Sequence, residues 1–341
     1  MFAANPTGTP LEDRRETVTF VIPVFNETEV LPELLREIER YRLDHSFVSD
    51  VLFVDDGSTD GTADTIRQLT RGLAGYHVIS FSRNFGHQLA ITAGLQHVTT
   101  DAAVILDADL QDPLHVVTEM VERWHEGYDV AYGMRRMRRG ESLVKRATAA
   151  LFYRFFRLMT DIEMPLDAGD FRLVSRRVID AFKELKEQRP FVRALIPWLG
   201  FPQVAVPYDR EKRFAGTPKY TYRKLVQMAI DGLASFSDKP LRIAVRVGLI
   251  LAVVSGIGGA VWAVAAKYVF QSALSGWASL MMVIAFLGGL NLFFMGLVGS
   301  YIARVFDQTK ERPRYVIADR WSSAAVTTRV APEIEAEIGD R

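Results

Sequence analysis

Two carboxylates, Asp107 and Asp109, follow a short apolar run and are separated by one residue. Side chains at this spacing can converge on one ion, and Mg²⁺ or Mn²⁺ commonly takes one or two protein carboxylates together with substrate phosphates. The alternative interpretation is an Asp-rich turn. Gln111 and the helix start at Asp112-Pro113 favour the metal. The sequence therefore predicts that Asp107, Asp109 and Gln111 bind a divalent cation.

A second acidic strand end lies at Asp55-Asp56, and the turn-forming residues 57–61 follow it. One interpretation is an Asp/Gly turn that caps the next helix. The other is a nucleotide contact, because acidic residues at strand ends hydrogen-bond ribose in nucleotide-binding folds. These residues alone leave both interpretations open.

Several other chemistries are excluded by what the chain lacks. It has 341 residues and no cysteine, which removes thiol catalysis, disulfides and Cys-ligated metal sites. The sequence contains no Gly-Lys dipeptide, and therefore no P-loop, no H-E-x-x-H, and no G-x-G-x-x-G after a strand. A phosphate-bearing ligand would therefore have to be held by a metal and by side chains.

The charge of the chain is balanced overall but uneven along its length. Lys plus Arg and Asp plus Glu both number 41, which argues against a nucleic-acid partner. Residues 26–67 carry eleven acidic and four basic residues, whereas residues 135–157 carry eight basic residues and one acidic residue. The basic band is either a solvated face or a contact with an anionic surface.

The elements that would position these residues alternate along the chain between Thr17 and about Ser235. Apolar runs predict strands at 18–24, 51–56, 77–82, 102–109 and 129–135, and amphipathic runs predict helices at 29–41, from 62, at 87–97 and after Pro113. This order predicts a mostly parallel α/β sheet, in which ligands bind at the carboxyl ends of the strands. The five strand ends lie at 23–27, 55–56, 82–84, 107–109 and 133–135. Three of them carry carboxylates. Residues 1–16 and 316–341 are expected to be loose ends.

Two long uncharged segments follow the α/β part: twenty residues at 247–266 and thirty-six at 268–303. About twenty helical residues cover the hydrocarbon core of a bilayer, so we expect membrane spans at about 245–267 and 278–303. Two buried helices of a soluble protein are the alternative. Only Lys267 lies in the turn, whereas the outer ends carry Lys239, Arg242, Arg246, Arg304, Lys310, Arg312 and Arg314. The positive-inside rule then places both long ends in the cytoplasm.

Six ordered motifs resemble one known family. They are VIPVFNE (21–27), VDDGS (54–58), SRNFG (82–86), DADLQDP (107–113), DAGDFR (167–172) and RFAGTPKY (213–220). They resemble family 2 glycosyltransferases of the polyprenyl-phosphate class, which includes bactoprenol glucosyltransferases and dolichyl-phosphate mannose synthases. The resemblance covers about Thr17 to Arg314. It implies a GT-A fold (Rossmann-like, mostly parallel), a nucleotide-sugar donor, a divalent metal and an inverting transfer to a lipid phosphate.

This resemblance and the apolar segments together imply a domain plan. Residues 1–16 form a flexible N-terminus, 17–235 the GT-A domain, 236–304 a two-helix transmembrane hairpin, and 305–341 a cytoplasmic tail. Segments 147–159 and 222–235 are expected to be interfacial helices, although 147–159 also suits an ordinary core helix. The expected location is a bacterial plasma membrane, with a multi-pass, homo-oligomeric protein whose catalytic domain is cytoplasmic.

The resemblance also assigns roles to individual residues. The residues expected to contact the nucleotide are Pro23, Phe25, Glu27, Val54 and Asp56. Those expected to bind the metal and the diphosphate are Asp107, Ala108, Asp109 and Gln111. Further substrate contacts are expected from Arg135, Lys145, Arg146, Arg213 and Lys219. Asp170 is the catalytic carboxylate. A phosphate acceptor already carries roughly −1.5 to −2 charges, so we expect Asp170 to orient it, through Arg172 or a nearby basic residue, or to stabilise charge at the sugar, more than to remove a proton. One departure is Thr217-Pro218, which stands where the bactoprenol branch usually has Glu-Ser, and the proline stiffens that loop.

The implied reaction transfers glucose from UDP-glucose to undecaprenyl or another polyprenyl phosphate. GDP-mannose or a UDP-aminoarabinose derivative are alternative donors that no residue here discriminates. A processive polysaccharide synthase would need more spans and a Q-x-x-R-W signature, which the chain lacks. A catalytically inactive membrane scaffold is disfavoured by the intact set Asp107, Asp109 and Asp170.

Overall fold

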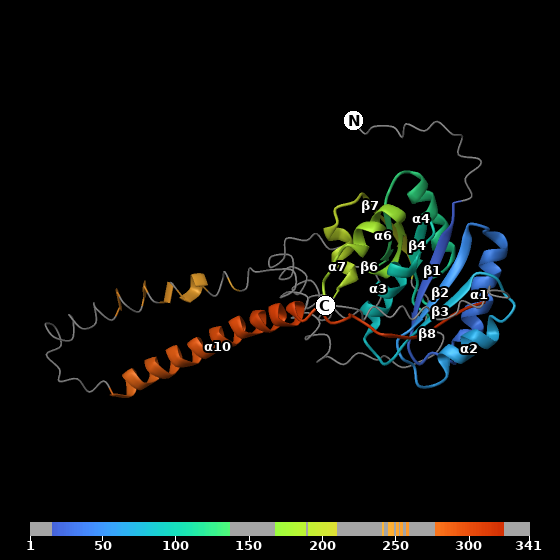
Figure 1. The fold of residues 1–341 in the computed structure, drawn as a ribbon. Helices are drawn as coiled ribbons and strands as arrows, with labels where there is room; N and C mark the ends of the chain where they lie inside the picture. The colour runs from blue at the N-terminus through green and yellow to red at the C-terminus, as the bar shows by residue number, and fades with distance from the viewer. Residues whose placement is uncertain are drawn as a thin grey trace, which may run out of the picture.

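The computed structural model describes residues 16–136, 168–188, 190–209, 277–323 and parts of 241–258. An eight-stranded sheet forms the centre of the described fold, in the order β7-β5-β6-β4-β1-β2-β3-β8. The long helix α10 extends away from it (Figure 1). The strands are β1 (Val18–Val24), β2 (Val48–Asp55), β3 (Tyr76–Phe81), β4 (Ala102–Ile105), β5 (Val130–Arg135), β6 (Ala168–Ser175), β7 (Gln203–Tyr208) and β8 (Ile317–Ser322).

Parallel pairing dominates the sheet, as the alternating pattern predicts. β1 pairs in parallel with β2 and β4, β2 with β3, and β5 with β7. β6 runs antiparallel between β4 and β5, and β8 runs antiparallel along β3. The mostly parallel α/β sheet is therefore confirmed, with three strands that the sequence did not predict: β6 and β8, which are antiparallel, and β7, which is parallel to β5.

Helices cover both faces of this sheet because successive strand residues point to opposite sides. On one face α1 (Leu31–Asp44), α2 (Thr62–Leu69) and α4 (His115–His125) pack against β1 residues such as Phe20 and Ile22. On the other face α3 (His87–His97), α6 (Arg176–Lys183) and α7 (Val192–Trp198) pack against Val21 and its neighbours. The sheet edge that carries the candidate site lies between these two helical layers.

The segment after α10 (Trp277–Thr309) returns to the sheet. β8 pairs with β3 over Ile317–Ser322, and Tyr315 stacks on Phe81 with 4.9 Å between ring centroids. The expectation that 316–341 is a loose end is therefore wrong for β8. Its two charged residues, Asp319 and Arg320, are exposed and suit an edge strand, and this is why no apolar run marks it.

One described helix is long and apolar enough to cross a membrane. The candidate span is Phe286–Thr309, with mean hydropathy 1.6, and large side chains such as Leu292 and Phe293 are exposed along it. The expected first span at 245–267 lies only partly within the described residues, so the two-helix hairpin is not confirmed. Segments 147–159 and 222–235 lie outside the described residues.

Candidate active site

The antiparallel strand β6 brings two distant acidic motifs to one edge of the sheet. Ile105 in β4 pairs with Arg172 in β6. Because the two strands run in opposite directions, Asp107 lies two residues beyond this pair on one strand, and Asp170 lies two residues before it on the other. The start of β6 thus lies beside the carboxyl end of β4, where α/β sheets bind ligands.

Four hydrogen bonds hold the carboxylate of Asp170, whose side chain is only 1% exposed. Arg193 donates from Nε to Oδ1 and from Nη2 to Oδ2, both at 2.8 Å. His87 Nε2 lies 3.2 Å from Oδ2, and Gln88 Nε2 donates to the same oxygen at 3.4 Å. Gln88 Oε1 also accepts the main-chain N–H of Val192 at 2.8 Å. The first turns of α3 and α7 therefore meet at Asp170.

These partners keep Asp170 ionised. Burial by itself would raise the pKa of Asp170, but the charge of Arg193 and the hydrogen bond from His87 outweigh burial and place the pKa far below its usual range. Burial would likewise lower the pKa of His87, yet the hydrogen bond to Asp170 and the charge of Asp107 raise it overall. Asp170 is consequently a poor proton acceptor in this arrangement.

Arg172, the expected basic partner of Asp170, has another contact. Its Nη2 donates to the main-chain carbonyl of Gly169 at 2.8 Å, and burial lowers the pKa of Arg172 to about 10. Among the hydrogen bonds that the described residues make to Asp170, the guanidinium partner is Arg193. Arg172 holds the start of β6, and the expectation that Asp170 works through a nearby basic residue applies to Arg193.

Asp107 and Asp109 lie at this edge next to His87. Asp107 Oδ1 is 3.6 Å from His87 Nε2, and burial raises the pKa of Asp107, with the charges of Asp170 and Asp109 adding to the effect. Asp109 and Gln111 are buried, and the Gln111 N–H donates to Asp109 Oδ1 at 3.2 Å. Negative charge collected out of water in this way fits a bound cation.

Asp107 and Asp109 could supply only part of the ligands that a divalent ion takes. Within the part of the chain that the structure describes, no three His, Asp or Glu side chains gather to hold a metal alone. An ion on Asp107 and Asp109 would thus take its remaining ligands from a phosphate-bearing substrate, as Mg²⁺ and Mn²⁺ sites commonly do. The predicted metal residues fit such an ion.

Arg135 lies at the end of β5, beside the start of β6. A Cβ atom added at Gly169 would lie 3.0 Å from Arg135 Nη2, so the glycine makes room for the guanidinium. Next to it, the Tyr208 hydroxyl donates to Asp112 Oδ1 at 2.7 Å and ties the loop after β4 to β7. The structure therefore brings Arg135 to the same edge as Asp107 and Asp170.

The predicted nucleotide residues lie at the ends of β1 and β2. Asp56 is buried and its carboxylate accepts the N–H groups of Phe85 at 2.6 Å and Gly86 at 2.9 Å, which fixes the loop before α3. Burial raises the pKa of Asp56, and these two hydrogen bonds oppose the rise. Val54 is fully buried in the core with Ala90 on α3, so its side chain does not reach the edge. A nucleotide role for Asp56 remains a prediction.

The structure describes some of the remaining predicted site residues but not all of them. Pro23 is buried in β1, while Phe25 and Glu27 are partly exposed just beyond it, and Ala108 is buried between the two metal-site carboxylates. The Glu27 N–H donates to Thr62 Oγ1 at 3.0 Å, joining the end of β1 to α2. Four predicted substrate residues lie outside the described residues: Lys145, Arg146, Arg213 and Lys219.

Sequence reasoning missed three members of the Asp170 cluster: His87, Gln88 and Arg193. The first two had a usable signal, because they directly follow the motif at 82–86 and begin a helix at the end of a strand. Arg193 had none, since its approach to Asp170 depends on β6 being antiparallel and on α7 packing beside α3.

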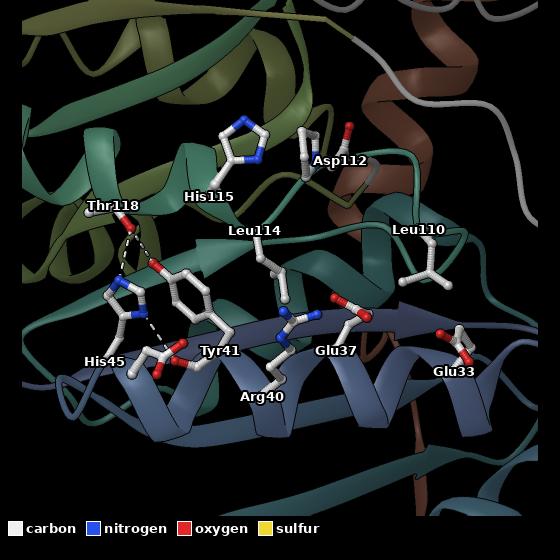
Figure 2. A pocket seen from close by; sticks show the side chains of 12 residues that line it. Glu33, Glu37, Arg40, Tyr41, His45, Leu110, Asp112, Leu114, His115 and Thr118 are labelled. Carbon is white, nitrogen blue, oxygen red and sulfur yellow. Dashed lines mark hydrogen bonds between the residues drawn. The ribbon is translucent and has the colours of Figure 1, made fainter.

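A separate groove of about 750 Å³ lies between α1 and the start of α4 (Figure 2). Tyr41 and His45 from α1 meet Thr118 from α4 there, with the Tyr41 and Thr118 hydroxyl oxygens 2.8 Å apart. Leu110 and Asp112 line the other end. None of Asp107, Asp109 and Asp170 lines this groove, so it is distinct from the acidic cluster.

Comparisons with known proteins show the family to which the sequence belongs. The profile described as Glycosyl transferase family 2 matches residues 19–182. The chain is 42% identical over 301 residues to "Uncharacterized glycosyltransferase YkcC" of Bacillus subtilis (strain 168), covering 88% of this chain and 92% of that protein. It is 37% identical over 300 residues to "Prophage bactoprenol glucosyl transferase homolog" of Escherichia coli (strain K12), covering 88% and 98%.

Among solved structures, a mannosyltransferase from Pyrobaculum calidifontis, in complex with GDP-Man and Mn²⁺, is 17% identical with a TM-score of 0.46, covering 88% of this chain and 87% of that one. The two matches cover nearly the whole length of these relatives. The family resemblance that the six motifs carry is confirmed. The mostly parallel sheet is the GT-A arrangement that this resemblance implies. The chain belongs to glycosyl transferase family 2.

Proposed function

We propose that this chain is a membrane-bound glycosyltransferase that transfers a sugar from a nucleotide-sugar donor to a polyprenyl phosphate. One observation carries the proposal: relatives named bactoprenol glucosyl transferase are 36% to 37% identical over 88% or more of this chain. The cluster of Asp107, Asp109 and Asp170 at one sheet edge supports it, because glycosyl transfer needs a place where a diphosphate can leave.

The apolar helix α10 supports a lipid acceptor. Its side chains are exposed along the candidate span, and its carboxyl end leads into β8, which is part of the catalytic sheet. A second membrane helix at 245–267 belongs to the proposal, and one contact favours it: a Cβ atom added at Gly248 would lie 4.0 Å from the Phe294 ring on α10. A catalytic domain fastened in this way would work at the membrane surface, on the cytoplasmic side.

The chemistry we propose is a displacement at the anomeric carbon. An oxygen of the polyprenyl phosphate forms the new bond to that carbon, the bond to the nucleoside diphosphate breaks, and the configuration inverts. Asp107, Asp109 and Gln111 would hold the divalent cation, Mg²⁺ or Mn²⁺, which when bound offsets the charge of the leaving diphosphate. Arg135, at the same edge, would contact the phosphate or the sugar.

Asp170 would orient and stabilise in this reaction. The phosphate acceptor is already an anion near neutral pH, so little proton transfer is needed. The carboxylate is buried and saturated with donors, which favours a fixed negative charge over a base. Its position beside His87 and Asp107 would place that charge near the reacting sugar.

The donor is the finer part of the proposal, and we propose UDP-glucose. The test uses the purified full-length chain in lipid vesicles that contain polyprenyl phosphate, with labelled UDP-glucose, GDP-mannose and a UDP-aminoarabinose derivative in separate reactions. Label in the lipid fraction from UDP-glucose, absent with Asp109→Asn, supports the proposal. Label from another donor alone would correct the sugar, and no label from any donor would overturn the function.

A further inference from the structure

We propose that Arg193, which lies outside all six family motifs, is a positioning residue that fixes the Asp170 carboxylate for catalysis. The inference rests on the proposed function, because it presumes that Asp170 serves sugar transfer. Arg193 stands at the second position of α7, and it reaches Asp170 across the layer of helices that covers the sheet.

The hydrogen bonds from Arg193 restrain both the position and the plane of the Asp170 carboxylate. Arg193 bonds both oxygens at 2.8 Å, one from Nε and one from Nη2. Two parallel bonds of this kind fix the plane of a carboxylate as well as its place. Of the side chains that the structure describes, only Arg193 bonds both Asp170 oxygens, whereas His87 and Gln88 reach Oδ2 alone.

Arg193 is itself well placed to act as a support. Its neighbour Val192 is buried and its N–H is bound by Gln88 of α3, so the first turn of α7 cannot shift without moving α3. The side chain of Arg193 is 37% exposed, against 1% for Asp170. The Arg193 side chain is therefore partly in contact with solvent, whereas the carboxylate that it binds is buried.

The cluster contains two carboxylates that one histidine contacts. Asp107 and Asp170 are neighbouring carboxylates, and His87 contacts both, at 3.6 Å and 3.2 Å. One imidazole cannot satisfy both at once, because its Nε2 carries a single hydrogen. Arg193 binds Asp170 independently of His87. The orientation of Asp170 therefore does not depend on which of the two carboxylates His87 contacts.

The test compares Arg193→Ala and Arg193→Lys with a matched control, Arg177→Ala, in the full-length membrane protein. Arg177 on α6 also pairs with a buried carboxylate, donating from Nη1 to Asp129 Oδ2 at 3.1 Å, but Asp129 lies away from the acidic cluster. For each variant, kcat and the two KM values are measured by sugar transfer, with thermal unfolding to verify the fold.

Misplacing a catalytic group by about 1 Å can cost about 100-fold in rate, so we expect Arg193→Ala to lower kcat by about that factor with the donor KM within about 3-fold. Arg193→Lys should remain at least about tenfold impaired, because an ammonium cannot make the paired bonds. Millimolar guanidinium should restore part of kcat in Arg193→Ala and none in Arg193→Lys. Arg177→Ala should match the wild type.

Three results would overturn the inference: Arg193→Ala with wild-type kcat, full recovery by Arg193→Lys, or a folded Arg193→Ala that guanidinium does not restore. If Arg193→Ala fails to fold, the folded lysine variant decides, since kcat near wild type rejects the need for paired bonds. A wild type inactive with every donor would overturn the proposed function and this inference with it, whereas an active wild type with active variants overturns the inference alone.

Discussion

Gln308, in the last turn of α10, clamps the main chain of the catalytic domain at Gln188. Its Oε1 accepts the N–H of Gln188 at 3.1 Å, and its Nε2 donates to the carbonyl of Lys186 at 2.8 Å. Arg314 donates to the nearby carbonyl of Leu185. The end of the apolar helix is thus fastened to the loop that leads into α7, the helix that carries Arg193.

Gln308→Ala should loosen this loop. Each hydrogen bond contributes about 1 kcal/mol, so the free energy of unfolding should fall by about 1–2 kcal/mol, and kcat should fall a fewfold because α7 is held less firmly. Hydrogen exchange at 185–188 should become faster. Thr309→Ala is the control, since the Thr309 hydroxyl donates to the Phe306 carbonyl within α10. Unchanged exchange in Gln308→Ala would show that the clamp does not order the loop.

Sugar transfer should require a divalent cation. Asp109→Asn removes one charge from the pair that would bind the ion, so activity should fall by about 100-fold or more while the circular dichroism spectrum stays unchanged. Chelation of the wild type should have the same effect, and Mg²⁺ or Mn²⁺ should reverse it. Transfer at the full rate in excess chelator would contradict the metal role of Asp107 and Asp109.

Asp170→Asn should lose activity severely, and raising the pH from 6 to 8.5 should not relieve the defect. The reason is that the pKa of Asp170 lies far below this range, so the wild-type residue is ionised throughout and acts through its charge. The measurement is the ratio of kcat/KM between variant and wild type across that range. A ratio that climbs about tenfold with pH would instead indicate a general base.

The same pKa shift has a consequence for stability. Because the folded-state pKa of Asp170 is lowered, its ion pair stabilises the domain fully above the ordinary pKa of about 3.9 and loses that effect as the pH falls below it. Denaturant unfolding of wild type and Asp170→Asn should therefore differ most near pH 7, and the difference should begin to shrink below about pH 4, with part of it still present at pH 3. A constant difference between these pH values would contradict the shift.

Gly57→Ala should disrupt the loop before α3. Gly57 has φ +70°, and an added Cβ would lie 2.4 Å from the main-chain carbon of Arg83, in the loop that Asp56 holds. Gly61 has φ +84° but nothing within 4 Å of an added Cβ. Gly61→Ala should therefore cost only the left-handed backbone penalty of about 1–2 kcal/mol. Gly57→Ala should cost about 1–3 kcal/mol more. Equal losses in thermal unfolding would show that the contact with Arg83 yields freely.

Both ends of the membrane segments should face the cytoplasm, because the flanking basic residues outnumber Lys267 in the turn. The chain has no cysteine, so single substitutions report cleanly. Ser272→Cys should react with an impermeant thiol reagent from outside intact cells, whereas Gln68→Cys and Arg320→Cys, at exposed positions, should not. The reverse pattern would overturn the topology.

Five strands, β1 to β5, could be predicted from the sequence, whereas β7, which pairs in parallel with β5, could not. β1 to β5 are apolar or lead into a strand-end motif, and the helices between them have one apolar face. Local sequence patterns are therefore enough to predict these strands and helices. β6 was missed because Asp170 and Arg172 interrupt its apolar run. Their burial depends on partners such as Arg193 that no local pattern reveals. β8 was missed because an exposed edge strand needs no apolar run.

Asp107 and Asp109 followed from the strand-end rule and Asp170 from the family resemblance, but the partners of these residues followed from neither. Asp107 and Asp109 lie just beyond β4, which ends at Ile105, and their spacing together with Gln111 and Asp112-Pro113 indicated a common ion. The role of Asp56 in holding Phe85 and Gly86 depends on the distance between two loops, which the sequence does not contain. The contact of Asp170 with Arg193 likewise depends on the packing of α7.

The measurement that tests the central claim most directly compares two acceptors that differ by one phosphate. Full-length protein in vesicles is given labelled UDP-glucose with either polyprenyl phosphate or the matching polyprenol, in the presence of Mg²⁺ and Mn²⁺. The account predicts labelled lipid with the phosphate only, and none with Asp109→Asn or Asp170→Asn. Equal labelling of polyprenol, or transfer that survives both substitutions, would contradict it.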